Sequence, residues 1–225
     1  MARVSWMTST RGSCVNMRNP HGPVPLQRAL FVALDEWVDG KAPPPSRTPR
    51  LKDGTLTTVD KVAFPAIPGI QVARRVNDIG VIRDWTKPDI DISKPYRVLV
   101  PQVNADGNET SGVLLPDIAV PLATHTGWNL YRAPFPEGEL CDRDGTYSPF
   151  PRTRAEREAK NDPRQSLEER YGSHANYVAR YQDAVQRLVK ERLLLPQDGE
   201  RYVARVRGDE VAKLFVKPPV EQASR

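Results

Sequence analysis

The stretch GVLLPDIAVPLATHTGWNL, residues 112–130, is the most apolar part of the chain and ends in a cluster of polar and aromatic residues. Pro116 and Pro121 interrupt it, and a proline inside a helix removes a hydrogen bond and clashes with the preceding turn. We therefore expect the segment DIAVPLA to be a buried extended run rather than a helix. Under this interpretation the stretch closes a core, and His125 lies in the loop at its end.

Four residues of that loop are candidates to line a substrate pocket, because they combine hydrogen-bonding groups with an aromatic face: His125, Thr126, Trp128 and Asn129. The chain has three histidines, none of them at metal-ligand spacing, and no glycine-rich phosphate loop. A lone histidine without a partner motif is more often structural than catalytic. We therefore assign no catalytic residue, no metal ligand and no cofactor, and a catalytic His125 in a site of its own is the least favoured interpretation.

The composition is that of a globular protein rich in proline. The 225 residues include 22 prolines, about twice the usual share, so much of the chain is expected to be loop or extended segment. The 33 basic and 28 acidic residues are interleaved, which is typical of a solvated surface and offers no basic stripe to nucleic acid. No apolar run reaches about 18 residues, so no membrane-spanning helix is expected.

The two cysteines, Cys14 and Cys141, match no zinc or redox spacing. Two free thiols are the favoured interpretation, because a disulfide persists only in an oxidising compartment. The N-terminal sequence MARVSWMTSTRGSC lacks the apolar region of a secretory signal, so a cytoplasmic location is the default expectation.

The clearest predicted helix covers residues 25–39. In PVPLQRALFVALDEWVDG the apolar residues recur at helical spacing, Pro25 suits a first turn and Gly40 suits the position after the last turn. The prolines of APPPSRTPRLKDG then predict an extended connector. A short strand is expected in TLTTV, and irregular extended segments in VAFPAIPGI and IRDWTKPDIDISKP.

The segments YRVLVPQV, NADG and NETSGVLLP predict a β-hairpin. Residues 98–100 are expected to form a strand buried on both faces, and Asp106 with Gly107 supplies the turn. Pro101 makes this an edge or bulged strand. NADGNE also resembles part of a calcium loop, but the full EF-hand pattern is missing and the turn is favoured.

The last third of the chain is predicted to be helical. TRAE at 153–156 and SLEE at 166–169 both match the capping box. Gly172 is expected to split the helix after the second box, Pro196 to end it, and a last helix to cover RYVARV and extend towards VAKLF. The stripe that this region buries consists of Tyr177, Val178, Tyr181, Val185, Leu188 and Val189.

A serine hydrolase of the α/β type needs the turn motif G-x-S-x-G, and the sequence contains none. Long stretches nevertheless resemble the C-terminal part of the bacterial α/β hydrolase domain-containing proteins. The resemblance covers roughly residues 14–206 and includes NPHGPVPLQRALFVALDEWVDGKAPPPSRTPRLKDGTL, YRVLVPQVNADGNETSGVLLPDIAVPLATHTGWNL and LCDRDGTYSPFPRTRAEREAKNDPRQSLEERYGSHANYV. Complete members carry their serine motif, and a histidine in a Gly-Thr-Gln-His context, upstream of this part, so no catalytic role is carried over.

The resemblance implies that the helix at 25–39 is the last helix of a hydrolase core and that residues 50–206 extend over that core. We therefore expect an α+β fold: mixed and proline-rich, with a β-hairpin region and C-terminal helices, the core sheet being largely missing. The expected parts are a disordered lead-in (1–18), the terminal core helix with its connector (19–49), an extended β region (50–150), a helical region (151–216) and a disordered tail (217–225).

The expected function is that of the C-terminal portion of a serine-type ester hydrolase, inactive on its own. The implied partner is a hydrolase-core chain, or a second copy of this chain bound through the helix at 25–39, because an exposed apolar face favours association. A non-catalytic partner-binding module is the alternative. Labelling of the native assembly with a serine-directed phosphonate separates the two hypotheses.

Overall fold

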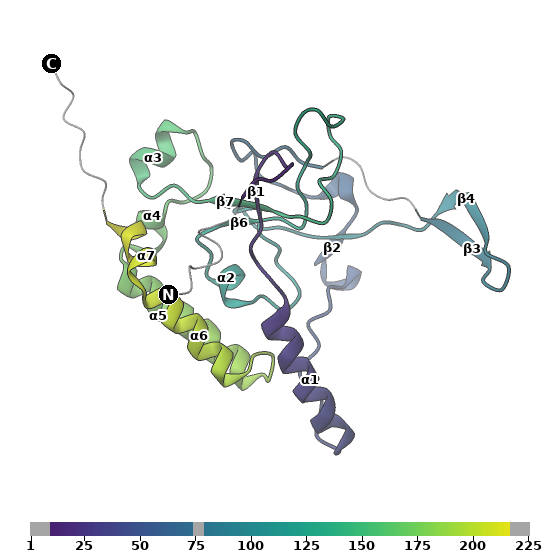
Figure 1. Cartoon of the computed structure of the whole chain (residues 1–225), viewed down its shortest axis with the longest axis horizontal. Coiled ribbons are helices and arrows are strands. Elements are labelled where there is room, and N and C mark those ends of the chain that lie inside the picture. The colour runs from purple at the N-terminus through teal and green to yellow at the C-terminus, as the bar shows by residue number, and fades with distance from the viewer. Residues whose placement is uncertain (1–9, 74–78, 217–225) are drawn as a thin grey trace.

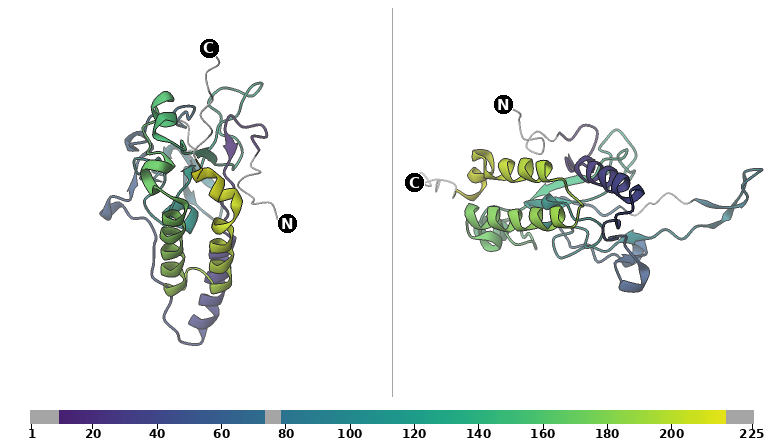
Figure 2. Two further views of the ribbon diagram at one scale, coloured as in Figure 1. Left: turned by 90° about the vertical axis from the view of Figure 1, so that its left-hand side faces the viewer. Right: turned by 90° about the horizontal axis from the view of Figure 1, so that it is seen from below.

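The computed structural model describes residues 10–73 and 79–216, and Figures 1 and 2 show their arrangement. This part of the chain contains seven α-helices and three small sheets. Two long helices, α5 (His174–Lys190) and α6 (Pro196–Arg207), lie side by side. A β-hairpin extends from the opposite end of the molecule (Figure 1). The mixed fold with small sheets agrees with the expected fold class.

The largest sheet has three antiparallel strands in the order β1-β7-β6: β1 (Met17–Arg18), β7 (Thr146–Pro149) and β6 (Ala123–His125). Tyr147 of the central strand lies opposite Met17 on one side and opposite His125 on the other. All strand pairs in the described residues are antiparallel, so this part of the chain holds no parallel hydrolase sheet.

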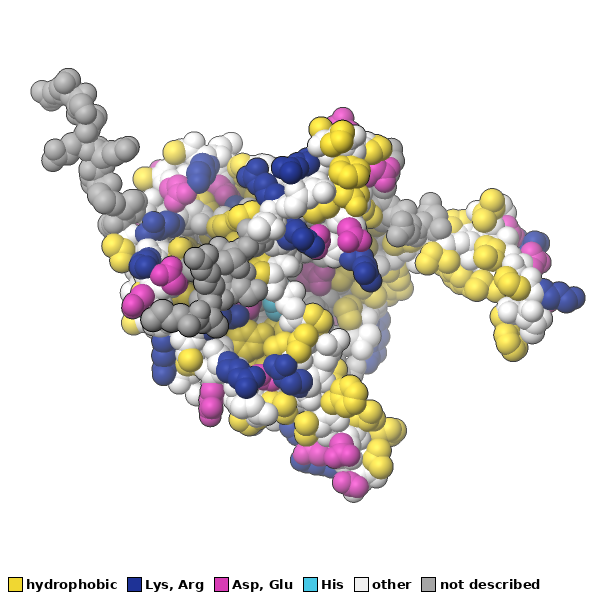
Figure 3. Space-filling view, viewed as in Figure 1, with side chains coloured by type: hydrophobic (Ala, Val, Ile, Leu, Met, Phe, Trp, Pro, Cys, Tyr) yellow, Lys and Arg dark blue, Asp and Glu magenta, His cyan; other side chains and the backbone are white. Residues whose placement is uncertain are grey.

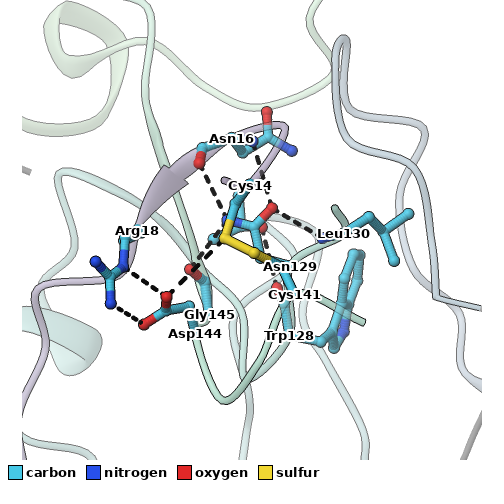
Figure 4. The surroundings of a disulfide bond; sticks show 10 residues. Cys14, Asn16, Arg18, Trp128, Asn129, Leu130, Cys141, Asp144 and Gly145 are labelled. Atoms are coloured by element: carbon cyan, nitrogen blue, oxygen red, sulfur yellow. Dashed lines mark hydrogen bonds and ion pairs between the residues drawn. A yellow bond between two sulfur atoms is a disulfide. The ribbon is translucent and has the colours of Figure 1, made fainter. Parts of the chain in front are cut away.

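A disulfide joins Cys14 to Cys141, with an S–S distance of 2.08 Å, and the prediction of two free thiols is wrong. The cysteines are 127 positions apart, and only the fold brings their Cα atoms to 5.6 Å, which is within the usual range for a disulfide. Figure 4 shows the surroundings of this bond, where the carboxylate of Asp144 pairs with Arg18 at 2.5 Å.

The same bond orders part of the expected disordered lead-in. Cys14 forms a backbone bridge with Tyr131, and β1 follows shortly after it. Residues 10–18 are therefore not free of structure, because the disulfide and the pairing with β7 fix them. Residues 1–9 and the predicted tail at 217–225 lie outside the described residues.

Helix α1 (Val24–Val38) confirms the predicted helix at 25–39, with a proline in its first turn. Its small residues Ala29 and Ala33 are buried. The guanidinium of Arg28 donates to the buried carboxylate of Asp198 on α6 at 2.6 Å, which attaches α1 to that helix. Much of the apolar surface of α1 stays exposed to solvent.

Strand β2 (Leu56–Thr57) confirms the strand predicted in TLTTV and pairs with β5 (Val100–Pro101). Residues 98–100 are half-buried, so the prediction of a strand buried on both faces is wrong. The physical reason is that β5 belongs to a sheet of only two strands, which offers little area for other elements to pack against both of its faces. The turn predicted at Asp106 and Gly107 is present: Gly107 has φ +76°, and the amide of Gly107 donates to the carbonyl of Asn104 at 2.9 Å. The predicted hairpin around it is wrong in its pairing, because β5 pairs with β2 and the NETSGVLLP segment forms no strand, only a bridge between Val103 and Glu109.

The segment IRDWTKPDIDISKP, predicted to be irregular, contains the longest hairpin, formed by β3 (Gly80–Asp84) and β4 (Asp89–Pro95). The Asp84 carboxylate accepts hydrogen bonds from the amide and hydroxyl of Thr86 and so closes the turn. A side chain at Gly80 would meet Ile90, since its Cβ would lie 2.7 Å from Cγ2 of that residue. The alternation of apolar and polar residues in DIDIS is the strand signal here, and it outweighs the neighbouring prolines.

The apolar stretch 112–130 is not extended throughout. Pro116 begins a one-turn helix, α2 (Pro116–Ala119), because proline fits the first turn of a helix, where its missing amide is not needed. The prediction of an extended DIAVPLA run is therefore wrong for its first half. After Pro121 the chain does become extended and enters β6.

The helical region begins with α3 (Arg154–Ala159) and α4 (Leu167–Tyr171). Ser166 and Glu169 form the complete capping box that SLEE predicted. Thr153 also caps its helix, but the Glu156 carboxylate accepts from the amide of Arg152 instead of closing the box. The second half of the TRAE prediction is therefore wrong.

Gly172, with φ +70°, separates α4 from α5 as predicted. Pro196 does not end α5, which stops at Lys190; it begins α6, again in the first turn. The last helices, α6 and α7 (Asp209–Ala212), cover the predicted RYVARV segment and continue towards a 3-10 turn at Lys213–Phe215.

The main hydrophobic core lies where the helices meet the stretch 112–130. Its most buried members are large, fully enclosed side chains from both parts: Leu115, Tyr177, Tyr181, Leu193, Leu194, Val206 and Val211. A buried ion pair, Arg164 with Asp162 at 2.7 Å, connects the helices to the sheet, because Arg164 also donates to the hydroxyl of Thr124 on β6 and the carbonyl of Ser148 on β7.

Candidate functional site

His125 lies at the end of β6 and is 8% exposed. Its amide donates to Oδ1 of Asn108 at 2.7 Å, and the Asn108 amide group donates to the carbonyl of Ala123 at 3.0 Å. Asn108 is fully buried, so it fixes this strand end against the 104–109 turn. In the sequence Asn108 indicates a turn or, as the less favoured alternative, a calcium ligand, and this supporting role was not predicted.

The hydrogen bonds of Asn19 determine the tautomer of His125. The Asn19 Nδ2 donates to the carbonyl of Thr126 at 3.2 Å, and its Oδ1 accepts from the amide of His21 at 3.0 Å. The same Oδ1 lies 2.8 Å from Nδ1 of His125, so that nitrogen carries the proton and Nε2 carries the lone pair. Burial lowers the pKa of His125 to about 4, which keeps the ring neutral at pH 7.

The structure separates the four predicted pocket residues into two groups. His125, Thr126 and Trp128 line one cavity, whereas Asn129 does not. Asn129 is buried and its side chain is saturated: Nδ2 donates to the carbonyls of Asn16 and Gly145, and Oδ1 accepts from the amide of Leu130 at 2.9 Å. These contacts, shown in Figure 4, attach the loop to the segments that carry the disulfide.

That cavity has a volume of about 270 Å³ and mostly aliphatic walls. The rings of Trp128 and Phe64 meet in it, with centroids 5.6 Å apart. Glu109 is the only acidic or basic residue in the described wall apart from the neutral His125. Burial raises the pKa of Glu109, and no described group forms a hydrogen bond or ion pair with its carboxylate.

A second, smaller cavity of about 40 Å³ lies on the other side of His125. His21, Tyr147 and Asp117 contribute to its wall, and Nδ1 of His21 is buried without a hydrogen-bond partner in the described residues. Asp117 accepts from Arg205 at 2.5 Å and from the hydroxyl of Tyr181 at 2.7 Å. A cavity of this size and polarity is suited to an ordered water molecule.

The arrangement around His125 includes a base and a residue that orients it, but no nucleophile. Within the described part of the chain, Asn19 is the one hydrogen-bond partner of the imidazole ring. Covalent catalysis by a hydroxyl or thiol requires that nucleophile within hydrogen-bond reach of the base. The one cluster of three metal-ligand residue types found among the described residues is Cys14, Cys141 and Asp144, and its sulfurs are joined in the disulfide and offer no thiolate.

The loop at 125–129 was predicted from the sequence, whereas Asn19, His21 and Glu109 were not. The prolines beside His21 indicate only a turn, and the position of Asn19 and His21 next to His125 results from contacts across more than 100 residues. In the sequence Glu109 indicates a residue of the hairpin turn or, as the less favoured alternative, a calcium ligand. No local pattern relates these residues to the apolar stretch.

Fold and site together define a mixed α/β protein with an apolar, ligand-sized cavity beside an oriented, neutral histidine. Residues 4–204 match the model of the alpha/beta hydrolase domain family, so the chain belongs to this family. Neither the curated proteins nor the solved structures contain a significant match to the chain. None of the helices described here combines the length and the apolar character that crossing a membrane requires.

Proposed function

We propose that this chain acts as the C-terminal portion of a serine-type ester hydrolase and works only together with a hydrolase core that carries the serine. Membership of the alpha/beta hydrolase domain family supports the type of chemistry. The absence of any G-x-S-x-G motif from the 225 residues supports a serine located elsewhere. The loop at 125–128 would then contribute a wall of the substrate pocket through His125, Thr126 and Trp128, with Asn129 supporting it.

The exposed apolar face of α1 is the observation that carries this proposal. Phe31 is 77% exposed, Val38 76% and Trp37 57%. Further apolar side chains of the helix, Leu30 and Leu34, are also exposed, and Figure 3 shows hydrophobic side chains gathered in this part of the molecule. Monomeric proteins rarely expose such a contiguous apolar surface.

The other face of α1 is firmly attached to the rest of the chain. Ala29 and Ala33 are buried, and ion pairs link Arg28 to Asp198 and Glu36 to Arg192. The apolar face of α1 is therefore exposed although the helix itself is packed against the rest of the chain. In α/β proteins a helix with an apolar face covers a sheet, and the described residues contain no sheet large enough to cover this one.

Affinity purification of the tagged chain from its native extract, followed by labelling with a fluorophosphonate, tests the proposal. We expect a labelled serine either on a co-purifying chain or on a native polypeptide larger than 25.2 kDa. A partner that carries no reactive serine would refute the hydrolase and support the non-catalytic binding module. A homo-oligomer with no labelled serine would also contradict the proposal.

Substitution in the exposed face links the labelled partner to α1. Burying a phenylalanine contributes about 1.5–3 kcal/mol, so Phe31→Glu should weaken association at least about tenfold. Gln186→Glu introduces the same charge at an exposed position of α5 and should leave association unchanged. Equal recovery of the labelled partner by both variants would show that α1 is not the docking surface.

A further inference from the structure

We propose that the cavity beside His125 binds a small ligand with an aromatic or aliphatic body and a positively charged nitrogen, which Glu109 recognises. This inference rests on the proposed role of the cavity as part of a substrate pocket and names the class of substrate. A cationic substrate group would lie against Glu109 while the apolar body fills the space between Phe64 and Trp128.

The size and walls of the cavity define the apolar body. Its volume of about 270 Å³ lies just below the ~300 Å³ at which pockets for drug-sized ligands begin, so it is suited to one substituted ring or a short branched chain. Phe64 and Trp128 provide aromatic surface, and the remaining wall is mainly aliphatic: Val59, Val62, Val72, Ala73, Val100, Pro101 and Val103. Ring stacking and aliphatic contact are both available to a ligand here.

The cavity is shaped in advance by its supports. A side chain at Gly107 would come within 2.9 Å of the Phe64 ring, so the backbone of the 104–109 turn lies directly against that ring. Asn108 joins this turn to the end of β6 through Ala123 and His125. Because these contacts already hold this side of the wall, a ligand does not bear the cost of ordering it.

The carboxylate of Glu109 in the cavity wall indicates that the polar group of the ligand is a cation. Asp106, which lies in the same turn as Glu109, pairs with Arg170 at 2.5 Å, whereas Glu109 has no cationic partner in the described residues. His125 does not serve as one, since it is neutral at pH 7. Glu109 is exposed to solvent and also lines the cavity, so a ligand cation can reach it, and the Trp128 ring in the same wall attracts the same kind of charge.

Binding of three probes of one skeleton tests this inference without requiring activity: 2-phenylethylammonium, 2-phenylethanol and phenylacetate. The indole N–H resonance of Trp128, assigned with Trp128→Phe, reports occupancy of the cavity in the purified chain. We expect the ammonium to bind with a dissociation constant on the order of a millimolar, at least about tenfold more tightly than the alcohol, and phenylacetate most weakly.

Glu109→Gln should abolish the preference for the ammonium and leave binding of 2-phenylethanol unchanged. Glu137→Gln removes the same charge from an exposed turn and should retain the preference. Equal affinities of the wild type for the ammonium and the alcohol, or no binding of any probe, would overturn the inference. The docking experiment is independent of this result: selective binding together with no labelled serine would refute the proposed function alone.

Discussion

Removal of the disulfide should destabilise the protein more than any exposed substitution. The bond between Cys14 and Cys141 closes a loop across 127 positions of sequence. The chain-entropy relation for a loop of this length gives about 4.9 kcal/mol at 25 °C, and measured values for disulfides are more often about 2–4 kcal/mol. We expect the variant Cys14→Ala/Cys141→Ala to lose about 3–5 kcal/mol, which for a chain of this size lowers Tm by roughly 10–15 °C.

Urea unfolding of the wild type and the double variant, followed by far-UV circular dichroism, measures this loss. Alanine is used because both cysteines are buried and a serine hydroxyl there would add its own desolvation cost. The wild type in reducing buffer provides a second comparison and should lose a similar amount. A loss below about 1 kcal/mol, or alkylation of both cysteines in the unreduced native protein, would refute the reasoning.

Three further predictions concern the sheet and its attachment. Arg164→Met leaves the buried Asp162 carboxylate unpaired and should cost about 3–5 kcal/mol in urea unfolding, whereas a loss below about 1 kcal/mol would show that the pair is dispensable. Because the pKa of His125 is about 4 in the folded state and near 6.5 when unfolded, stability should fall by about 3 kcal/mol as pH drops from 6.5 to 4. His125→Gln should remove this part of the pH dependence, and identical stability profiles of the two proteins would contradict it. Gly145→Ala should cost about 1–3 kcal/mol, because its Cβ would meet the Thr126 carbonyl, and an unchanged Tm would refute this close approach.

Local signals in the sequence located most helices correctly. The apolar spacing of α1, the capping box at Ser166 and the break at Gly172 act over a few residues, and the structure bears them out. Two of the errors arose where prolines were expected to break structure: Pro116 and Pro196 begin helices instead. Proline has one favoured backbone angle that suits both an extended segment and a first helical turn, so its local effect depends on the conformation of the residues after it.

Local patterns in the sequence were enough to predict most helical segments and the turn at Gly107. They also show no nucleophile motif and make the loop at 125–129 a candidate site. The packed fold was needed to show that Cys14 meets Cys141, that Asn19 orients His125, and that Glu109 lines an apolar cavity without a partner among the described residues. These contacts join residues separated by many turns of chain. Helix and turn patterns reflect interactions within a few residues, whereas such contacts depend on how the packed elements bring distant side chains together.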